Sequence, residues 1–505
     1  MDSLRNLLIW NASARDPFFL GLVAAIMILL AILLVSKPRL YLPLILFTAP
    51  LPKLFTIAKY DVSYTTAAPG FSVVDMVLAA GIAGLLFRRW RRTADPVSRA
   101  FGRAMTIWSA SVMLSVFVGF VVWSGTYQAV FAVYAVRYIL TLASFVVAGQ
   151  YTYTECSDRS LRKILHGLAI AGNITILLGL VYYISFGSSD SGSKGVTLWM
   201  TGDNSVALNR TFFWFFDYGN DMGYYAALIG ILDIILLSDR RLVGLRLLTA
   251  IGLVGCVATI LLIGERADVL VLVVAVGYLL WETSKFKHRS VKVSFAFQFV
   301  CLAAVVLAFV ATMSIIAPEF ISKKFQRSSG EDENRQASLQ LMMTVGVPDG
   351  IAEAVSSLPI GDFALRFALN VSGVWYFMNH PEGVGYWGQL AAAGFYSHHE
   401  FVTVLIEQGF PGLAALFFFM VRLKRLLWSA RNQPGAAGQL NVLLRTISVG
   451  LFAAMVGANT VILDMKFMLV YWALVGVWSV IPRDVRQVSP AILVAAPPRR
   501  VAARV

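Results

Sequence analysis

Apolar runs of about 20 residues recur along the whole chain, and each is long enough to cross a lipid bilayer as a helix. The chain has 505 residues, of which 58% are hydrophobic and only 14% are charged. Soluble domains average roughly 45–50% apolar and about 25% charged residues, so this chain has too few polar side chains to cover a water-exposed surface. Its three cysteines also exclude a disulfide-stabilised secreted scaffold. The sequence therefore predicts an all-α, polytopic membrane protein.

The run length predicts 12 or 13 transmembrane helices. One run, 40–57, contains Pro43, Pro50 and Pro52, which kink or break a helix, so a half-helix is the alternative to a full span there. The candidate spans lie near 17–35, 40–57, 71–87, 104–123, 128–149, 164–186, 211–237, 247–263, 267–281, 293–316, 400–420, 443–462 and 467–481.

Lysine and arginine gather in alternate loops, most densely at 88–92. Basic loops remain in the cytoplasm, so these loops fix the orientation and place the C-terminus inside. They also account for the net charge of +14, which is scattered between spans rather than gathered for nucleic-acid binding. Strict alternation places the N-terminus outside, but a half-helix at 40–57 leaves its side open. The first apolar run lacks a small-residue cleavage site, and no cleavable signal peptide is expected.

The longest loop falls on the non-cytoplasmic side of the predicted membrane. Its first part, 323–336, is polar, whereas 351–379 carries enough apolar surface to pack one or two short helices on the bundle. Because long loops are usually functional, we expect the active surface there. The predicted division is an N-terminal transmembrane bundle at 1–316, a partly helical periplasmic loop at 317–398, C-terminal transmembrane helices at 399–482 and a basic cytoplasmic tail at 483–505.

Several arginines lie within spans or near the outer boundary, where a charge is costly and often functional. These are Arg137, Arg210, Arg266 and Arg366. Each has a structural alternative, such as a pair between Arg266 and Glu265, or between Arg137 and an aspartate of the 211–237 span. Together they exceed what such pairs need, and clustered guanidinium groups suit a phosphate or pyrophosphate. Asn220 and Glu407 are further polar candidates in the outer halves of their spans.

Two adjacent histidines, His398 and His399, end the long loop and precede Glu400. A metal site is not predicted, because there is no His-Glu-x-x-His pattern and adjacent histidines on a helix start point in different directions. No Asp-x-Asp or Walker loop is present, so the sequence predicts neither a metal nor a nucleotide cofactor.

The segment 398–412 resembles the signature of the O-antigen ligase and polymerase superfamily. In that family a histidine at the outer mouth of a helix precedes an apolar helix and a Glu-x-Gly-x-x-Gly sequence. His398 falls at the histidine position, and Glu407, Gly409 and Gly412 fit the second part. His399 falls where the family often has asparagine.

Further matches extend the resemblance to about residues 70–480. Residues 381–385 resemble the family's Pro-x-x-Gly-Val-Gly turn, one residue shorter, and Arg366 matches the arginine that precedes it. Residues 262–266 resemble a Gly-Ser-Arg turn, with Glu265 in place of serine. Residues 210–220 resemble an Arg plus Asn segment, without the family's usual Pro-Asn pair.

The resemblance implies a GT-C-like, metal-independent, inverting glycosyltransferase in the bacterial inner membrane, with its active site facing the periplasm. Its donor is a glycan on undecaprenyl pyrophosphate, and its acceptor is a lipid-linked repeat unit or lipid A-core. Chain length and Glu265 slightly favour the repeat-unit polymerase over the ligase. The resemblance also raises a flippase and a chain-length regulator as further partners, in addition to the lipid bilayer.

The residue chemistry agrees with this assignment. A pyrophosphate leaving group needs fixed positive charge, which Arg266 and Arg366 supply. An acceptor hydroxyl needs a base that titrates near neutral pH, which is the role expected of His398. Substrate-binding roles are expected for Arg210, Arg137, Asn220, Glu407 and His399.

Two other classes remain open. A secondary transporter of a polar or anionic substrate would use the intramembrane Arg and Asp residues as binding sites. The lack of an apparent internal repeat and the long outer loop count against it. The third class is a non-catalytic membrane assembly protein.

Overall fold

The computed structural model describes most of the helical regions of the chain. The residues described are 17–37, 40–51, 53–56, 70–89, 99–122, 140, 143–150, 157–186, 219–238, 245–263, 266–284, 331–357, 361–385, 389, 397, 399–429, 435–457 and 466–481. Among them the bundle helices are α2 (Pro17–Ser36), α3 (Tyr41–Thr48), α4 (Val73–Arg89), α5 (Arg99–Val122), α7 (Asp158–Phe186), α9 (Gly219–Leu237), α10 (Arg246–Ile263), α11 (Arg266–Ser284), α18 (Glu400–Trp428), α19 (Gly435–Gly457) and α20 (Lys466–Val480).

Four of the described helices, α5, α7, α18 and α19, are long and apolar enough to cross a membrane. Shorter apolar helices lie within α2, α4, α9, α10 and α20. The prediction of a helical membrane protein is thus supported. The number of spans stays a prediction, because 293–316 and most of 128–149 lie outside the described residues.

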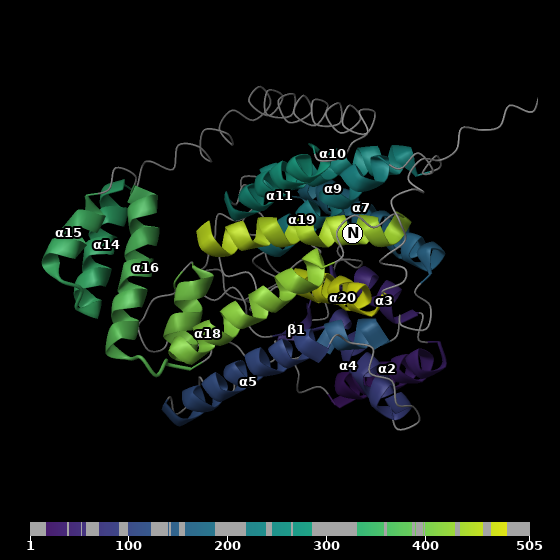
Figure 1. The fold of residues 1–505 in the computed structure, drawn as a ribbon, viewed down its shortest axis with the longest axis horizontal. Helices are drawn as coiled ribbons and strands as arrows, with labels where there is room; N and C mark the ends of the chain where they lie inside the picture. The colour runs from purple at the N-terminus through teal and green to yellow at the C-terminus, as the bar shows by residue number, and fades with distance from the viewer. Residues whose placement is uncertain are drawn as a thin grey trace, which may run out of the picture.

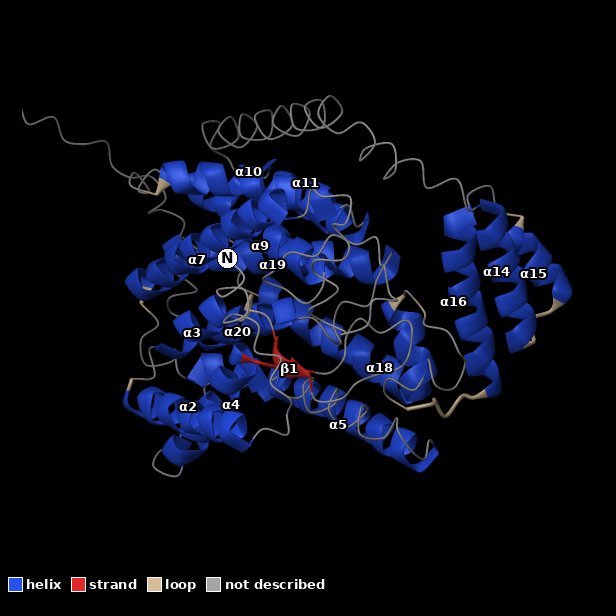
Figure 2. Ribbon diagram, turned by 180° about the vertical axis from the view of Figure 1, so that it is seen from behind, coloured by secondary structure: helices blue, strands red, loops and turns tan. Residues whose placement is uncertain are grey.

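The second predicted span is a half-helix. Helix α3 ends at Thr48, before Pro50 and Pro52, and the chain continues as strand β1 (Lys53–Thr56). This strand pairs antiparallel with β2 (Gly70–Ser72) and forms the small ribbon in Figure 2. The proline-rich sequence therefore breaks the helix as expected.

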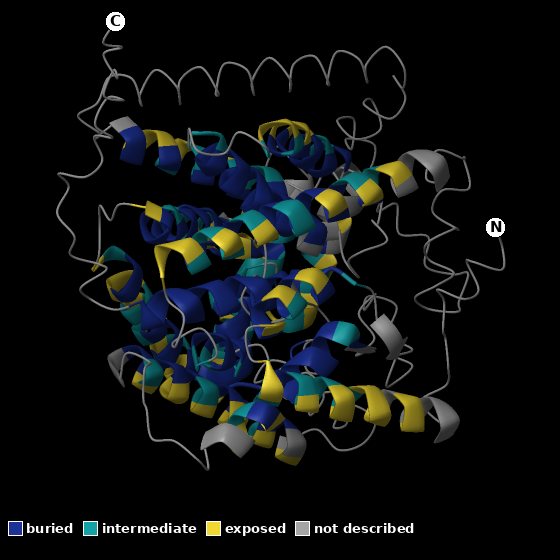
Figure 3. Cartoon of the chain, turned by 90° about the vertical axis from the view of Figure 1, so that its right-hand side faces the viewer, coloured by how far each residue is buried: buried dark blue, intermediate teal, exposed yellow. Residues whose placement is uncertain are grey.

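Helices α9 and α20 occupy the centre of the bundle. Every residue from Met222 to Leu236 and from Phe467 to Ile481 is buried. Exposed apolar side chains lie on faces of the other helices instead. Figure 3 shows the exposed positions in yellow around the buried core. Lipid tails are as apolar as these side chains, so such faces are stable in a membrane.

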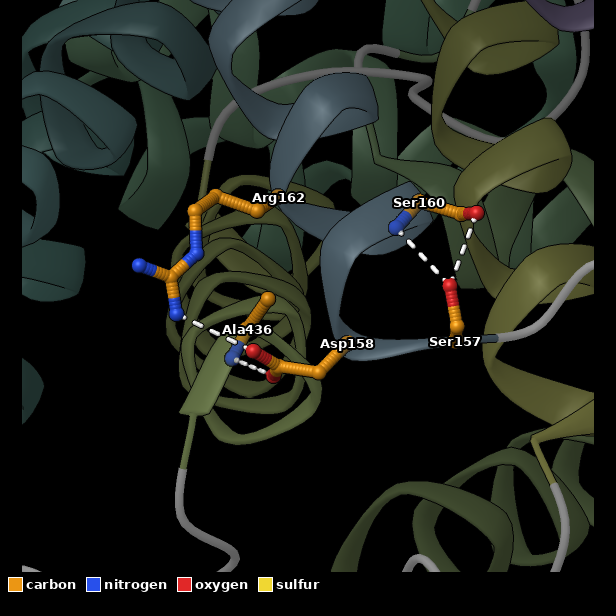
Figure 4. A network of polar contacts seen from close by, with 5 residues as sticks. All are labelled: Ser157, Asp158, Ser160, Arg162 and Ala436. Atoms are coloured by element: carbon orange, nitrogen blue, oxygen red, sulfur yellow. Dashed lines mark hydrogen bonds and ion pairs between the residues drawn. The ribbon is translucent and has the colours of Figure 1, made fainter.

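One end of the bundle is where α7 and α19 begin, and we call it the Asp158 end. The Asp158 carboxylate accepts hydrogen bonds from the backbone N–H of Ala436 at 2.7 Å and from Arg162 at 3.0 Å (Figure 4). The first contact joins two segments that the charge pattern places on the same side of the membrane. Near this end a buried ion pair joins Arg445 of α19 to Glu282 of α11, at 3.4 Å.

The opposite end is where α9, α11 and α18 begin and α19 ends, and we call it the His399 end. Beyond it, α14 (Glu331–Val345), α15 (Asp349–Ser356) and α16 (Gly361–Asn379) stand across the direction of α5 and α19 (Figure 1). They share a small core of their own, formed by Met342, Val347, Ala352, Val355 and Ala368.

The 351–379 part of this loop forms two helices, α15 and α16, in agreement with the prediction of one or two short helices there, whereas α14 was not predicted. Helix α14 begins at Glu331, inside the segment that composition alone marks only as polar. Acidic residues suit the first turn of a helix, and the α14 residues that pack inward, Ser338 and Met342, come only later. Gly346 and Val347 end α14 by donating to the carbonyls of Met343 and Met342, with Gly346 in the left-handed region at φ +79°.

Candidate functional site

Helix α18 is broken at Gly409, which adopts φ +67° and ψ −169° inside the helix. Only glycine takes such a conformation readily. Two residues later Pro411 has no N–H, so the carbonyl of Glu407 loses its usual partner four residues on. The two parts of α18 therefore point in different directions (Figure 1).

The turn at 381–385 satisfies the carbonyls that this break leaves free. The N–H of Val384 donates to the carbonyl of Ile406 at 2.9 Å, and that of Gly385 donates to Glu407, also at 2.9 Å. The hydroxyl of Ser115, from α5, donates to the same Glu407 carbonyl at 2.9 Å. Buried backbone groups need partners, so the turn and α5 stabilise the broken helix.

The turn approaches both helices so closely that side chains are excluded. A Cβ on Gly385, at φ +95°, would lie 2.4 Å from the Cα of Gly119 in α5. A Cβ on Gly383, at φ +83°, would lie 2.7 Å from the backbone N of Gly409. The turn, the break and this face of α5 thus form one block, which we call the 385–409 junction. It joins two segments that carry the family resemblance.

Helix α16 contacts the start of α18. A Cβ on Gly373 would lie 2.6 Å from Cγ1 of Val402, so the two helices are close. One turn earlier, Asn370 accepts a hydrogen bond from the hydroxyl of Ser397 at 3.0 Å. Ser397 is fully buried and also accepts from the N–H of His399 at 3.2 Å.

Sequence reasoning missed Ser397, because it lies two residues before the N-cap position of α18, His399, where no capping pattern marks it. Its hydroxyl contacts Asn370 of α16 and the N–H of His399, so it joins α16 to the start of α18. His398 itself lies outside the described residues, as do Arg137 and Arg210.

Arg366 lies on α16 four residues before Asn370. Residues four apart share a helix face, so Arg366 is on the side of α16 that meets the start of α18. Its side chain is half-buried. The structure therefore places this predicted arginine one helical turn before Asn370, which accepts the hydrogen bond from Ser397.

His399 precedes the first turn of α18 in an extended conformation. Its ring lies 5.7 Å from the ring of Phe401, centroid to centroid. Burial lowers the pKa of His399, and a hydrogen bond with the backbone carbonyl of Val456 in α19 partly opposes that effect. Among the described residues, its Nδ1 atom is buried without a hydrogen-bond partner. The neutral imidazole is thus favoured.

Asn220 and Arg266 lie in the first turns of α9 and α11, which are adjacent. A Cβ on Gly223 would lie 2.0 Å from Oδ2 of Asp268, so the Asp268 carboxylate rests against α9. Asn220 precedes Gly223 by three residues, and Arg266 precedes Asp268 by two. Their backbones share the His399 end, and their side chains are not described.

Helix α19 connects this pair with His399. A Cβ on Gly450 would lie 2.6 Å from the carbonyl O of Val271 in α11, five residues beyond Arg266. Six residues further along α19, Val456 contacts His399. The last turn of α19 is therefore flanked by the starts of α11 and α18.

Glu407 has a different place from the other candidates. Its side chain is only 1% exposed and lies two turns into α18, next to the break. Its backbone carbonyl accepts the hydrogen bonds from Gly385 and Ser115 that form the junction. A substrate-binding role for the carboxylate remains a prediction.

In the described parts of the chain, no group of three or more His, Cys, Asp or Glu residues is arranged to hold a metal ion. Comparison with models of protein families and with curated proteins gave no match to this chain.

Proposed function

We propose that this protein is a glycosyltransferase of the O-antigen ligase and polymerase type. It transfers a glycan from undecaprenyl pyrophosphate to an acceptor sugar at the periplasmic face of the bacterial inner membrane. The reaction inverts the anomeric centre and needs no metal. A lipid-linked repeat unit is favoured as the acceptor over lipid A-core.

The 385–409 junction is the observation that carries this proposal. Two segments with the family's motif pattern, 381–385 and 398–412, are joined by backbone hydrogen bonds from Val384 and Gly385 to the carbonyls beside Gly409. The resemblance rests on glycines at fixed positions, and three of them, Gly383, Gly385 and Gly409, adopt positive φ. One contact needs all three glycines, which supports a common role for the two segments.

In the proposed reaction, the histidine acts as the base and the arginines stabilise the leaving group. His398 takes the proton of the acceptor hydroxyl as its oxygen forms the new bond to the anomeric carbon. The bond from that carbon to the pyrophosphate oxygen breaks, and the electron pair leaves with the pyrophosphate. Arg266 and Arg366 neutralise the charge that develops there, with Arg210 in support. The half-buried position of Arg366 strengthens such a contact relative to open water.

The central experiment uses the purified full chain in nanodiscs with undecaprenyl-pyrophosphate glycan, in EDTA and without nucleotide. Longer lipid-linked glycans are the expected product, together with released undecaprenyl pyrophosphate. Addition of lipid A-core tests the ligase alternative in the same assay. His398→Ala should abolish transfer while leaving donor binding largely intact. Absence of any glycan transfer to either acceptor contradicts the proposal.

Arginine substitutions test the pyrophosphate contacts. Arg366→Lys keeps the charge but loses the bidentate fork, so its rate should fall on the order of 10- to 100-fold, nearly as far as that of Arg366→Ala. Arg266→Lys should behave in the same way. The matched control is Arg103→Lys, because Arg103 is exposed on α5 away from the junction. Near-full activity of both site variants would show that only general charge is needed there.

A transporter is the second candidate, because broken helices that leave backbone groups inside the bundle are typical of secondary transporters. The break at Gly409 fits that description. Assays in sealed proteoliposomes distinguish the transporter from the glycosyltransferase. A transporter moves solute across the membrane without altering a lipid-linked glycan, whereas the proposed enzyme lengthens or transfers it.

A further inference from the structure

One face of α16 is apolar and uncovered. Phe367, Val374 and Met378 are 44%, 40% and 56% exposed. Their spacing of seven and four residues places them within about 40° of one another around the helix, at 3.6 residues per turn. We call these three residues the α16 stripe.

The α16 stripe is separate from the faces that α16 uses for protein contacts. Asn370 and Gly373 face α18, at the hydrogen bond to Ser397 and the close approach to Val402. Ala368 and Trp375 face the small core shared with α14 and α15. The stripe lies between these two faces and carries no charged residue.

Helix α16 is joined through the 381–385 turn to candidate membrane spans. Met378 lies just before the 381–385 turn, which docks on the break at Gly409. Phe410, which follows Gly409 in α18, is 67% exposed. Phe117 of α5, near the Ser115 contact, is 65% exposed. Both lie in helices that are long and apolar enough to span a bilayer.

We infer that α16 lies in the membrane interface at the His399 end, with the α16 stripe inserted among lipid acyl chains. Interfacial amphipathic helices lie in the membrane plane and bury an apolar face roughly 5–10 Å into the headgroup and acyl boundary. The crosswise direction of α16 relative to α5 and α19 fits this placement (Figure 1). The occupant of the stripe is bilayer lipid, because the 381–385 turn joins α16 to helices that are long and apolar enough to span a bilayer.

This placement fixes the depth of Arg366, the residue directly before Phe367. Arg366 lies about 80–120° around α16 from the stripe, on the side that meets α18, and a long basic side chain in the interface extends toward the lipid phosphates. The guanidinium is thereby held at the level where the pyrophosphate of a lipid-linked substrate lies. Only this last step rests on the proposed function.

Spin labels at single cysteines test the depth of the stripe. The three native cysteines, Cys156, Cys256 and Cys301, are replaced first. Val374→Cys and Met378→Cys then carry the label in full-length protein in nanodiscs of mixed zwitterionic and anionic lipid. Phe117→Cys serves as the lipid-exposed control. Glu353→Cys, at an exposed position of α15, serves as the aqueous control.

The labels at 374 and 378 should collide more often with oxygen, which concentrates in the bilayer, than with a water-soluble nickel chelate. They should resemble the label at 117 and differ from that at 353. Aqueous behaviour at both stripe positions overturns the inference. Shielding from both reagents also overturns it, since it means that protein covers the stripe. Failure of the glycan assay would leave these collision rates unchanged, so the two proposals are tested separately.

Discussion

At the residue scale, backbone conformation governs the 385–409 junction more than side-chain chemistry does. Gly385 and Gly409 both have φ in the left-handed region, and each faces backbone atoms rather than flexible side chains. Backbone atoms cannot move aside as a side chain can. The junction therefore tolerates no Cβ at these positions.

Gly385→Ala should destabilise the protein. Positive φ costs a residue with a side chain roughly 1–2 kcal/mol, and overpacking against Gly119 adds about 1–3 kcal/mol. Gly277→Ala is the control, because Gly277 lies in α11 with no atom within 4 Å of its Cβ position. That change should be neutral or stabilise by about 0.5–1 kcal/mol. Thermal unfolding in detergent measures both, and equal midpoints for the two variants contradict the junction.

His399 should make stability depend on pH. Its pKa is lowered by burial, so between that lowered pKa and about 6.5 the unfolded chain binds more protons than the folded one. Stability should therefore fall as pH decreases through this window and level off below the folded pKa. His399→Asn should show a shallower slope there. Thermal midpoints from pH 4.5 to 8 test this, and identical slopes for both proteins would refute it.

At the element scale, distant segments hold helix ends in place. In the first turn of α19, the backbone N–H of Ala436 donates to the Asp158 carboxylate at the start of α7. The two residues are 278 positions apart. No local sequence pattern reveals such a cap.

Asp158→Ala should cost about 0.5–2 kcal/mol, the usual loss when a helix N-cap is removed. Asp158→Asn keeps an acceptor oxygen and should lose less. Arg162→Ala removes only the ion pair between exposed side chains, which contributes about 0–1 kcal/mol. Thermal unfolding of the three variants ranks their losses of stability. A loss in Arg162→Ala as large as that in Asp158→Ala would mean that the ion pair, not the cap, is what matters.

Hydropathy predicted most bundle helices, and Pro50 and Pro52 predicted the end of α3, because these signals are local. Helix α14 was missed because its first turn is polar. The signals for the junction were present, since Pro411 is four residues after Glu407 and Gly385 lies in a glycine-rich turn. Pairing them required the fold, because a freed carbonyl does not specify which distant N–H will reach it.

At the scale of the whole molecule, the His399 end gathers the first residues of α9, α11 and α18, and the crosswise helix α16 contacts α18 there. Sequence charge predicts that this end faces outward. The contact of Asp158 with Ala436 supports the relative arrangement of the loops but leaves the absolute orientation as a prediction.

Cysteine labelling tests that orientation. In a background without native cysteines, Glu353→Cys should react with a membrane-impermeant maleimide in intact spheroplasts. Lys163→Cys, exposed near the Asp158 end, should react only after lysis. The reverse pattern inverts the orientation and removes the periplasmic site. Labelling of both in intact spheroplasts would show that the two ends are not on opposite sides.

The contact between α5 and the broken helix also sets a schedule for synthesis. Ser115 enters the membrane early, yet its partner carbonyl is 292 residues later in the chain. At about 5–20 residues per second, the ribosome needs roughly 15–60 s to supply that partner. For this interval the face of α5 that carries Ser111, Ser115 and Gly119 has no final neighbour and must be matched by lipid, water or another part of the nascent chain. Assembly of the junction is therefore a late event, completed only after α14, α15 and α16 have been synthesised.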